Sequence, residues 1–348
     1  MRYFIKENNL KFYKEPAEFN KYTPKETLQY AVGANLYMPA TQHDIFRKLS
    51  NGAFGDLGSI TLCMEDAISD EQLPEAEKDV QKLLSRIYEY GRKDSLPLVF
   101  IRVRNTEQFM SFSSVLSDEQ LSTVCGFCFP KFNSANGREY FRILDELIRR
   151  SGATLYAMPI IEDRKAMYKE SRFQELSDIR CILEENYSRV LNVRVGGTDF
   201  SSIYGLRRQL DTTIYDIKVV ADCLKDILNF FLRDENNFVV SGPVWEYYSW
   251  NENSPEIKGL KHELSLDIQN GFHGKTIIHP SQIEAVNKAY IVDYDEYQDA
   301  VNILHSHGGV FAGVNGNRMN ETNPHRSWAT KVMAKAEIFG VVEKNVII

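Results

Sequence analysis

The chain has 348 residues, of which 43% are hydrophobic, 26% charged and 12% aromatic, with 20 Gly and 11 Pro. This composition supplies enough apolar material for a sizeable core, and it excludes a disordered chain and a collagen-like repeat. The formal net charge is −7 and no block of Lys and Arg stands out. We therefore expect no nucleic-acid partner and no binding to an anionic membrane, and we expect a small ligand.

The five cysteines lack the spacing of a disulfide framework, as in proteins kept in a reducing compartment. Cys125 and Cys128 form a lone C-x-x-C with no second pair and no nearby histidine, so packing in a buried strand explains them better than zinc. The sequence shows neither a signal-peptide core nor an uncharged apolar run of about 18 residues. These features predict a cytoplasmic protein without a membrane partner.

From Ala34 onward, short apolar runs alternate with longer segments of helical periodicity. Buried parallel strands have this short, often β-branched character. No run is followed by the glycine-rich phosphate loop of the common nucleotide-binding folds. The eight runs are Ala34–Met38, Ser59–Met64, Pro97–Arg104, Gly126–Pro130, Thr154–Ile160, Val190–Val195, Phe238–Ser241 and Thr276–Ile278.

Eight strand–helix repeats predict an α/β fold, an eight-stranded parallel (β/α)8 TIM barrel, because a doubly wound open sheet more usually has about five or six strands. We assign residues 34–290 to the barrel, 1–33 to an N-terminal extension and 291–348 to a C-terminal lid or helical extension. Just after the last strand, residues 280–290 are expected to form a helix with a Ser281/Glu284 capping box.

Polar side chains follow nearly every run, at the strand ends where barrels of this kind form active sites. Glu162 and Asp199 end neighbouring strands, so their carboxylates can converge on one hard cation such as Mg²⁺, or Mn²⁺ in its place. Water and substrate oxygens would complete the coordination. From periodicity alone, solvated loop acids or helix caps are the more frequent explanation of such residues.

Arg102 and Arg104 are two residues apart on one predicted strand, so we expect both to point to the face that forms the barrel mouth. A guanidinium there can bind a carboxylate and stabilise negative charge on a carbonyl oxygen. A structural ion pair with Glu65 or Asp66 is the alternative. His279 ends the last strand and is either placed by a strand-to-helix turn or an acid–base group.

Seven short motifs each lie at a predicted strand end. These are Leu36-Tyr-Met-Pro-Ala40, Met64-Glu-Asp-Ala-Ile68, Ile101-Arg-Val-Arg-Asn105, Phe129-Pro-Lys131, Met158-Pro-Ile-Ile-Glu162, Gly196-Gly-Thr-Asp199 and Gly274-Lys-Thr-Ile-Ile-His-Pro-Ser-Gln282. In this order they resemble the motifs of the citrate lyase β-chain and malyl-thioester lyase family, in the hydroxy-acid aldolase superfamily. The branch is similar to the citrate-lyase-like proteins of bacterial tellurium-resistance gene clusters.

The resemblance implies a Mg²⁺-dependent carbon–carbon lyase that performs retro-aldol or retro-Claisen cleavage, or its reverse, on a hydroxy acid or its thioester. It implies that Glu162 and Asp199 are metal ligands and that Arg102 binds the reacting carbonyl or carboxylate. Glu65 and Asp66 are expected beside them in the catalytic group. The base is either one of these two carboxylates or a metal-bound water.

The remaining expected substrate-binding residues are Lys131, Gly197, Thr198 and Arg104. Arg104 departs from the Arg-x-Asn pattern of the family, so it is either an added anion contact or the sign of a register shifted by two residues. The resemblance implies a small anionic substrate, free or carried as a coenzyme A or carrier thioester, and a homo-oligomeric enzyme.

The C-terminal segment contains Met319-Asn320-Glu321 ahead of an apolar helix expected from Ser327 to about Ile338. In the thioester lyases that it resembles, a Met-x-Asp segment brings an acid over a barrel mouth, often that of a neighbouring subunit. The resemblance implies that Glu321 is that acid, which protonates the enolate or guides the acyl fragment. A solvated turn acid is the alternative.

A fold does not by itself establish an activity. The alternative, of another class, is therefore that the chain is a catalytically weak barrel that senses a ligand or takes part in assembling a stress-response complex. The clustered strand-end carboxylates argue against it, since their mutual repulsion costs stability when no cation is bound.

Overall fold

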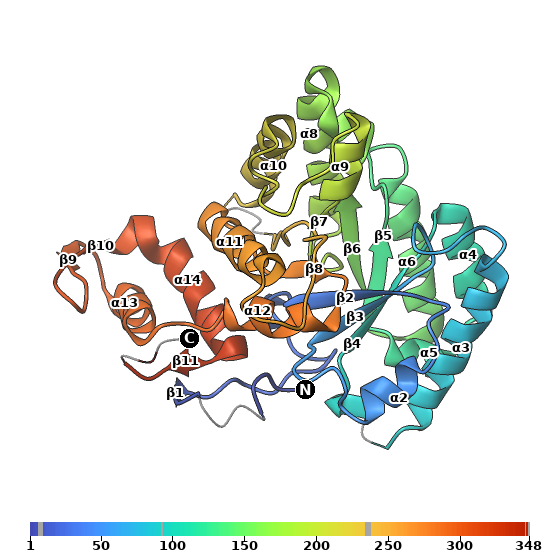
Figure 1. The fold of residues 1–348 in the computed structure, drawn as a ribbon, viewed down its shortest axis with the longest axis horizontal. Coiled ribbons are helices and arrows are strands. Elements are labelled where there is room, and N and C mark those ends of the chain that lie inside the picture. The colour runs from blue at the N-terminus through green and yellow to red at the C-terminus, as the bar shows by residue number, and fades with distance from the viewer. Residues whose placement is uncertain (6–9, 92, 234–237, 345, 347–348) are drawn as a thin grey trace.

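The computed structural model describes residues 1–5, 10–91, 93–233, 238–344 and 346. In this part of the chain a curled parallel sheet is covered by helices on its outer face (Figure 1). Its strands, in spatial order, are β7 (Arg194–Val195), β6 (Tyr156–Ile161), β5 (Gly126–Phe129), β4 (Leu98–Arg102), β3 (Ser59–Cys63), β2 (Ala34–Pro39) and β8 (Lys275–Ile277).

The seventh predicted strand, Phe238–Ser241, closes the gap between β7 and β8 through isolated bridges. Val193 pairs with Val240, and Gly242 pairs with Lys275, both in parallel. The N–H of Ser241 also donates to the carbonyl oxygen of Val193 at 2.9 Å. The predicted parallel barrel is therefore confirmed, with one member held by only a few hydrogen bonds.

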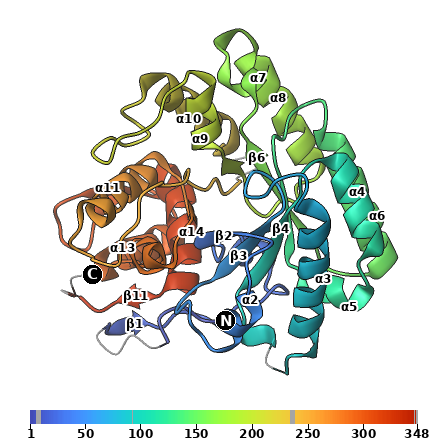
Figure 2. The same ribbon diagram turned by 45° about the vertical axis from the view of Figure 1, so that its right-hand side comes forward.

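The helices lie on the outside of this sheet, and Figure 2 shows α3, α4, α5 and α6 side by side along one flank. Their bounds are α1 (Lys25–Leu28), α2 (Ile45–Ser50), α3 (Leu73–Glu89), α4 (Thr106–Val115), α5 (Asp118–Thr123), α6 (Gly137–Ser151), α7 (Arg164–Met167), α8 (Lys169–Glu185), α9 (Gly197–Ile203), α10 (Lys218–Phe231), α11 (Pro255–Asn270) and α12 (Ile283–Lys288). None of the helices in the described ranges is both long and apolar enough to cross a bilayer.

Helix α6 shows how the sequence produces this arrangement. Its apolar residues recur every three or four positions, so Phe141, Leu144 and Leu147 are buried against the sheet. Arg142 lies on the opposite face, where it pairs with Glu139 at 2.7 Å. The helix ends at Gly152, whose φ of 65° is the left-handed conformation that glycine adopts without strain.

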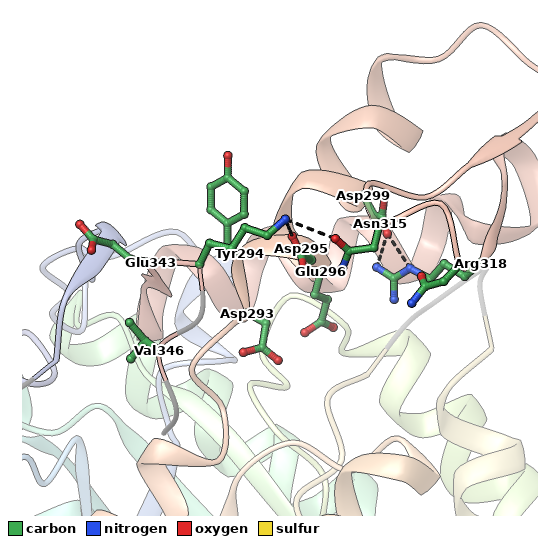
Figure 3. A pocket seen from close by; sticks show the side chains of 11 residues that line it. Asp293, Tyr294, Asp295, Glu296, Asp299, Asn315, Arg318, Glu343 and Val346 are labelled. Atoms are coloured by element: carbon green, nitrogen blue, oxygen red, sulfur yellow. Dashed lines mark hydrogen bonds and ion pairs between the residues drawn. The ribbon is translucent and has the colours of Figure 1, made fainter.

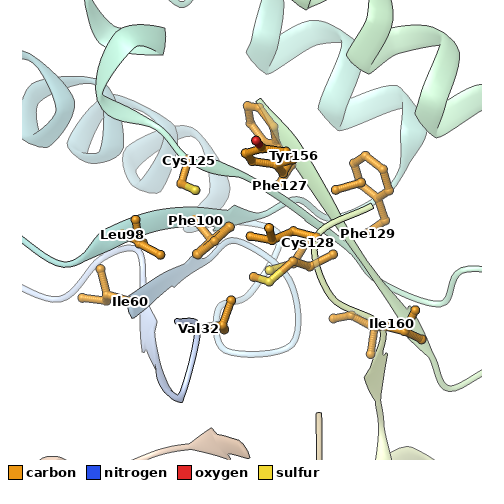
Figure 4. Close-up of a cluster of buried hydrophobic side chains, with 14 of the residues drawn as sticks. Val32, Ile60, Leu98, Phe100, Cys125, Phe127, Cys128, Phe129, Tyr156 and Ile160 are labelled. Carbon is orange, nitrogen blue, oxygen red and sulfur yellow. The ribbon is translucent and has the colours of Figure 1, made fainter. Parts of the chain in front are cut away.

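Large apolar side chains from β3 to β6 fill the core, as Figure 4 shows around Phe127 and Cys128. The rings of Phe129 and Tyr140 stack at 4.5 Å between centroids. Cys125 and Cys128 are both buried here, and burial raises the pKa of the Cys125 thiol to about 12. This environment matches the packing explanation of the C-x-x-C pair, and all five cysteines are free thiols.

The two chain ends meet at the amino end of the barrel. Strand β1 (Phe12–Lys14) pairs antiparallel with β11 (Val341–Val342). The Tyr3 ring stacks on Phe339 at 4.7 Å, and its hydroxyl lies so close to Gly58 that a Cβ there would clash with it. Because Gly58 precedes β3, the chain ends cover the side of the barrel opposite to the carboxyl ends of the strands.

The rest of the C-terminal segment consists of two helices and a hairpin, α13 (Tyr294–His305), β9 (Val310–Ala312), β10 (Met319–Glu321) and α14 (Thr322–Phe339). Helix α14 thus begins five residues before the predicted Ser327.

The predicted Ser281/Glu284 capping box is wrong. A 3₁₀ turn, Pro280–Gln282, precedes α12, and its cap is His279. The Ser281 N–H donates to Nδ1 of His279, and the His279 N–H donates to Oε1 of Gln282, both at 3.2 Å. An imidazole nitrogen replaces the hydroxyl oxygen that the sequence pattern pointed to.

Candidate active site

Charged side chains from successive strands meet at the carboxyl end of the barrel. They border a cavity of about 230 Å³ whose lining includes Tyr37, Arg102, Glu162, Arg194 and Asp199. The charged residues that follow or end the strands here are Glu65 and Asp66 after β3, Arg102 on β4, Lys131 after β5, Glu162 after β6 and Asp199 in the first turn of α9.

Arg102 is the centre of this group. Its Nη2 lies 2.8 Å from Glu65 Oε2, 3.0 Å from Glu162 Oε1 and 3.5 Å from Asp66 Oδ2. Burial by itself would lower the pKa of Arg102, but the charges of Glu162 and Glu65 raise it well above its usual value. The ion pair considered as an alternative therefore forms, while Arg102 still lines the cavity.

Lys131 reaches the same group through an unusual backbone conformation. Its φ is 48°, a left-handed value that is uncommon for a residue with a side chain and often marks a functional site. The conformation aims its N–H at Glu162 Oε1, at 2.9 Å. Its ammonium pairs with Glu65 and lies 3.4 Å from both Asp66 oxygens.

Glu162 has one oxygen committed and one available. Oε1 accepts hydrogen bonds from Arg102 and from the Lys131 N–H. Oε2 faces Gly196, where a Cβ would clash with it and would lie 3.2 Å from Asp199 Oδ2. Burial, and to a lesser degree the charge of Asp199, raise the pKa of Glu162 to about 7, against the opposing effect of Arg102.

This donor set fits a hard divalent cation. Mg²⁺ is commonly held by one or two carboxylates together with water and substrate oxygens, and Glu162 Oε2 and Asp199 Oδ2 border the same small space beside Gly196. No group of three or more His, Cys, Asp or Glu in the described residues is arranged to hold a metal ion. The two carboxylates would therefore leave the other coordination positions to water and substrate.

Gly197 and Thr198 also line the cavity. Gly197 packs closely on Pro243, to which an added Cβ would approach within 2.8 Å. The Thr198 hydroxyl donates to Glu246 Oε1 at 2.8 Å. The first turn of α9 thus presents its backbone to the cavity beside Asp199.

Arg104 and Arg102 do not share a face. Strand β4 ends at Arg102, so the alternation of side chains does not continue to Arg104. The Arg104 guanidinium instead pairs with Asp70 at 2.6 Å and donates to the carbonyl oxygen of Ile68 at 3.1 Å. The structure therefore does not bring Arg104 together with the other predicted site residues.

Glu321 is also separate from the site within one chain. It ends β10, and its N–H donates to Nδ1 of His325 at 3.0 Å. The hairpin packs on α13 and α14 and lies at the outer edge of the molecule (Figure 1). A role for Glu321 at the mouth of a neighbouring subunit stays a prediction.

His279 has the role of a turn residue, as its cap hydrogen bonds show. Its ring stacks on Tyr248 at 4.2 Å, and Trp250 packs edge-on against it at 5.1 Å. These contacts fix the ring at the rim of the barrel mouth.

Sequence reasoning missed one residue of the cavity, Arg194. It lies on β7 beside the ring of Tyr37, with 5.5 Å between the guanidinium carbon and the ring centroid. The signal was a single charged residue within the run 190–195, because a cation inside a buried strand of a barrel must point to a polar space. The apolar pattern of the run predicts only a strand.

A larger cavity, of about 460 Å³, lies in the C-terminal segment and is not the candidate site. Two of its acids bind neighbouring side chains, as Figure 3 shows for Asp299 with Arg318, at 2.5 Å, and for Asp295 with Asn315, also at 2.5 Å. None of the charged strand-end residues lines it.

Comparison with known proteins gives a family and a set of similar folds. A family model described as a C–C bond lyase of the TIM-barrel fold matches residues 26–341. No curated protein matches the chain.

Solved structures of similar fold include the following three. A citrate lyase from Burkholderia xenovorans LB400 has a TM-score of 0.68 at 15% identity, over 90% of this chain and 94% of its own. The CitE protein of Mycobacterium tuberculosis in complex with magnesium, acetoacetate and coenzyme A has a TM-score of 0.57 at 18% identity, over 88% and 99%. The citrate lyase β subunit of the same organism, complexed with oxaloacetate and magnesium, has 0.51 at 16%, over 76% and 99%. The tellurium-resistance branch stays a prediction.

Proposed function

Since the chain belongs to the family of C–C bond lyases of the TIM-barrel fold, we propose that it is a Mg²⁺-dependent lyase of small anionic hydroxy acids or their thioesters. The observation that carries this proposal is the pair of carboxylate oxygens, Glu162 Oε2 and Asp199 Oδ2, that border Gly196. Structures of similar fold were determined with magnesium and small oxo acids, which supports the choice of cation and of substrate class.

The reaction is the cleavage of a carbon–carbon bond next to a carbonyl. A base removes the hydroxyl proton, the oxygen forms a new carbonyl, and the electron pair of the breaking bond passes to the adjacent carbonyl as an enolate, which is then protonated. Mg²⁺, when bound, supplies a Lewis acid for the substrate oxygens. Glu162 and Asp199 would hold it.

The chain's own residues stabilise the charge that develops. Arg102 lines the cavity and can donate to the enolate oxygen, since its Nε has no hydrogen-bond partner. Glu65 and Lys131 hold the Arg102 guanidinium and the Glu162 carboxylate in place. Of the two acids expected as the base, Asp66 lines the cavity and Glu65 does not, so we assign the proton transfer to Asp66 and a positioning role to Glu65.

The test is a calorimetric titration of the full chain with Mg²⁺, followed by a screen of hydroxy acids and their coenzyme A thioesters for cleavage. Glu162→Gln and Asp199→Asn should each weaken Mg²⁺ binding at least tenfold, since each removes one of two charged ligands. Asp70→Asn, a matched loss of one carboxylate at an exposed position outside the cavity, should bind Mg²⁺ like the wild type. Affinity within about twofold of wild type in both site variants would overturn the metal site and favour the ligand-sensing alternative.

A further inference from the structure

Arg194 is a buried cation without a counter-ion. It is 1% exposed, and its Nη2 donates to Thr276 Oγ1 at 2.5 Å. Its Nε and Nη1 have no hydrogen-bond partner, and in the described part of the chain no carboxylate lies within the 4 Å of an ion pair. Since Nε carries one hydrogen and Nη1 two, more than half of its donors are unmet.

Such an arrangement is costly unless a ligand satisfies it. An unmet buried donor is unfavourable, and a buried charge without a partner is more so. The Tyr37 ring beneath the guanidinium offsets only part of this, because a cation–π contact is weaker than a charge-assisted hydrogen bond. Arg102, in the same cavity, shows the contrast, since Glu65, Asp66 and Glu162 all lie around it.

The remaining charges of the cavity lining explain why a cation is needed there. Asp66, Glu162 and Asp199 all line it, so an anionic ligand that entered without a cation of its own would be repelled. The two arginines lie on different strands, Arg102 on β4 and Arg194 on β7, which β5 and β6 separate in the sheet. They therefore approach the cavity from different sides.

We propose that Arg194 binds a second oxyanion group of the substrate, distinct from the end held near Arg102, Glu162 and Asp199. The substrate is then a small acid with two anionic groups. This inference rests on the proposed function for the placement of the first group. A carboxylate and a phosphoryl group share the chemistry that a guanidinium recognises, and the small cavity volume, about 230 Å³, favours a compact ligand.

The experiment compares three 2-hydroxy acids that differ only beyond the hydroxyl carbon, namely malate with a carboxylate, 3-phosphoglycerate with a phosphate and 2-hydroxybutyrate with a methyl group. Their dissociation constants are measured by calorimetry in saturating Mg²⁺. The wild type should bind malate or 3-phosphoglycerate at least tenfold more tightly than 2-hydroxybutyrate, and the preferred one identifies the second group. Arg194→Met should lose this preference while it binds 2-hydroxybutyrate within about twofold of wild type.

Two further variants separate recognition from general charge and from folding. Arg194→Lys should retain part of the preference, because it keeps the charge and loses the planar donors. Arg207→Met removes the same charge from an exposed position and should keep the preference unchanged. The melting temperature of ligand-free Arg194→Met should equal or exceed that of the wild type, because an uncompensated charge is removed.

A wild type that binds Mg²⁺ but discriminates none of the three acids, or an Arg194→Met variant that keeps the preference, overturns the inference and leaves Arg194 solvated by buried water. If the protein binds no Mg²⁺, the proposed function fails separately. In that case the binding of malonate and of inorganic phosphate to the wild type and to Arg194→Met is measured in the presence of EDTA. Binding that Arg194→Met weakens at least tenfold supports the anion site, and equal binding by both proteins overturns it.

Discussion

Two buried groups of charges in this molecule differ in whether all of their polar atoms have hydrogen-bond partners. In the first, between β8 and α11, Lys275 lies 2.9 Å from Glu263 Oε1 and 2.6 Å from Asp267 Oδ2, and all three side chains are fully buried. Arg208 and the Tyr215 hydroxyl bind the remaining carboxylate oxygens, each at 2.6 Å. We call this the closed cluster, because no polar atom of Lys275, Glu263 or Asp267 is without a partner.

We call the second group, at the barrel mouth, the open cluster. Arg102 Nε and two nitrogens of Arg194 have no partner, although they are buried. Glu162 Oε2 and Asp199 Oδ2 both border Gly196. A closed cluster fixes how two elements pack, whereas an open one keeps donors and acceptors for a ligand. The two clusters therefore differ in whether their hydrogen bonds are satisfied within the protein, and not in whether they contain charges of both signs.

The largest expected effect tests the closed cluster. Lys275→Met leaves two buried carboxylates without their common cation, so the free energy of unfolding should fall by about 3–5 kcal/mol. Unfolding in urea measures it. Lys82→Met, which removes an exposed lysine paired with Asp79, should cost less than about 1 kcal/mol. Equal losses in the two variants would show that the closed cluster does not stabilise the fold.

A buried group near the amino end of the barrel gives a pH dependence of stability opposite in sign to that of Glu162 at the mouth, whose raised pKa lets the folded chain keep a proton that the unfolded chain loses. Burial lowers the pKa of His273 to about 3 from an ordinary 6.5, and its ring nitrogen Nε2 contacts the carbonyl oxygen of Tyr30 at 3.0 Å. Between these values the unfolded chain binds a proton that the folded chain does not. Stability from this group is therefore complete above about pH 6.5 and is lost on acidification, by up to about 1.4 kcal/mol per pH unit.

The measurement is the unfolding free energy from pH 7.5 to pH 4.5 for wild type and His273→Phe, with the exposed His305→Gln as the control. The wild type and the control should lose stability more steeply than His273→Phe. Parallel curves for all three proteins would contradict a neutral buried His273.

The third prediction tests whether the open cluster binds the cation beside Gly196. Gly196→Ala places a methyl group against Glu162 Oε2, in the space where the cation would lie. Affinity for Mg²⁺ should fall at least tenfold, or about 1.4 kcal/mol, and the melting temperature should also fall, because the new Cβ would clash with the Cβ of the buried Glu162. Gly91→Ala, at a position with nothing within 4 Å of the new Cβ, is the matched control. Unchanged calorimetry in Gly196→Ala would place the cation elsewhere.

Most of the barrel could be predicted because a buried parallel strand is a local pattern. The rule that polar residues follow strands also placed Glu65, Asp66, Arg102, Lys131 and Glu162 in one group. It failed where the strand ended earlier than its apolar run, as at Arg104. The chain ends were harder, because the pairing of Phe12 with Val342 depends on a contact between distant parts of the sequence that periodicity does not encode.

The smallest expected effect separates the two arginines that the sequence grouped together. Arg102→Lys exchanges a planar donor among Glu65, Asp66 and Glu162 for a point charge, so cleavage of the natural substrate should fall at least tenfold. Arg104→Lys should keep turnover and Mg²⁺ affinity within about twofold of wild type, because the Arg104 guanidinium binds the loop after β3. Its partner Asp70 is 86% exposed, and an exposed pair contributes about 0–1 kcal/mol, so even the melting temperature should barely move. Loss of turnover in folded Arg104→Lys would mean that the loop carrying Asp70 rearranges over the mouth when substrate binds, and that Arg104 belongs to the open cluster after all.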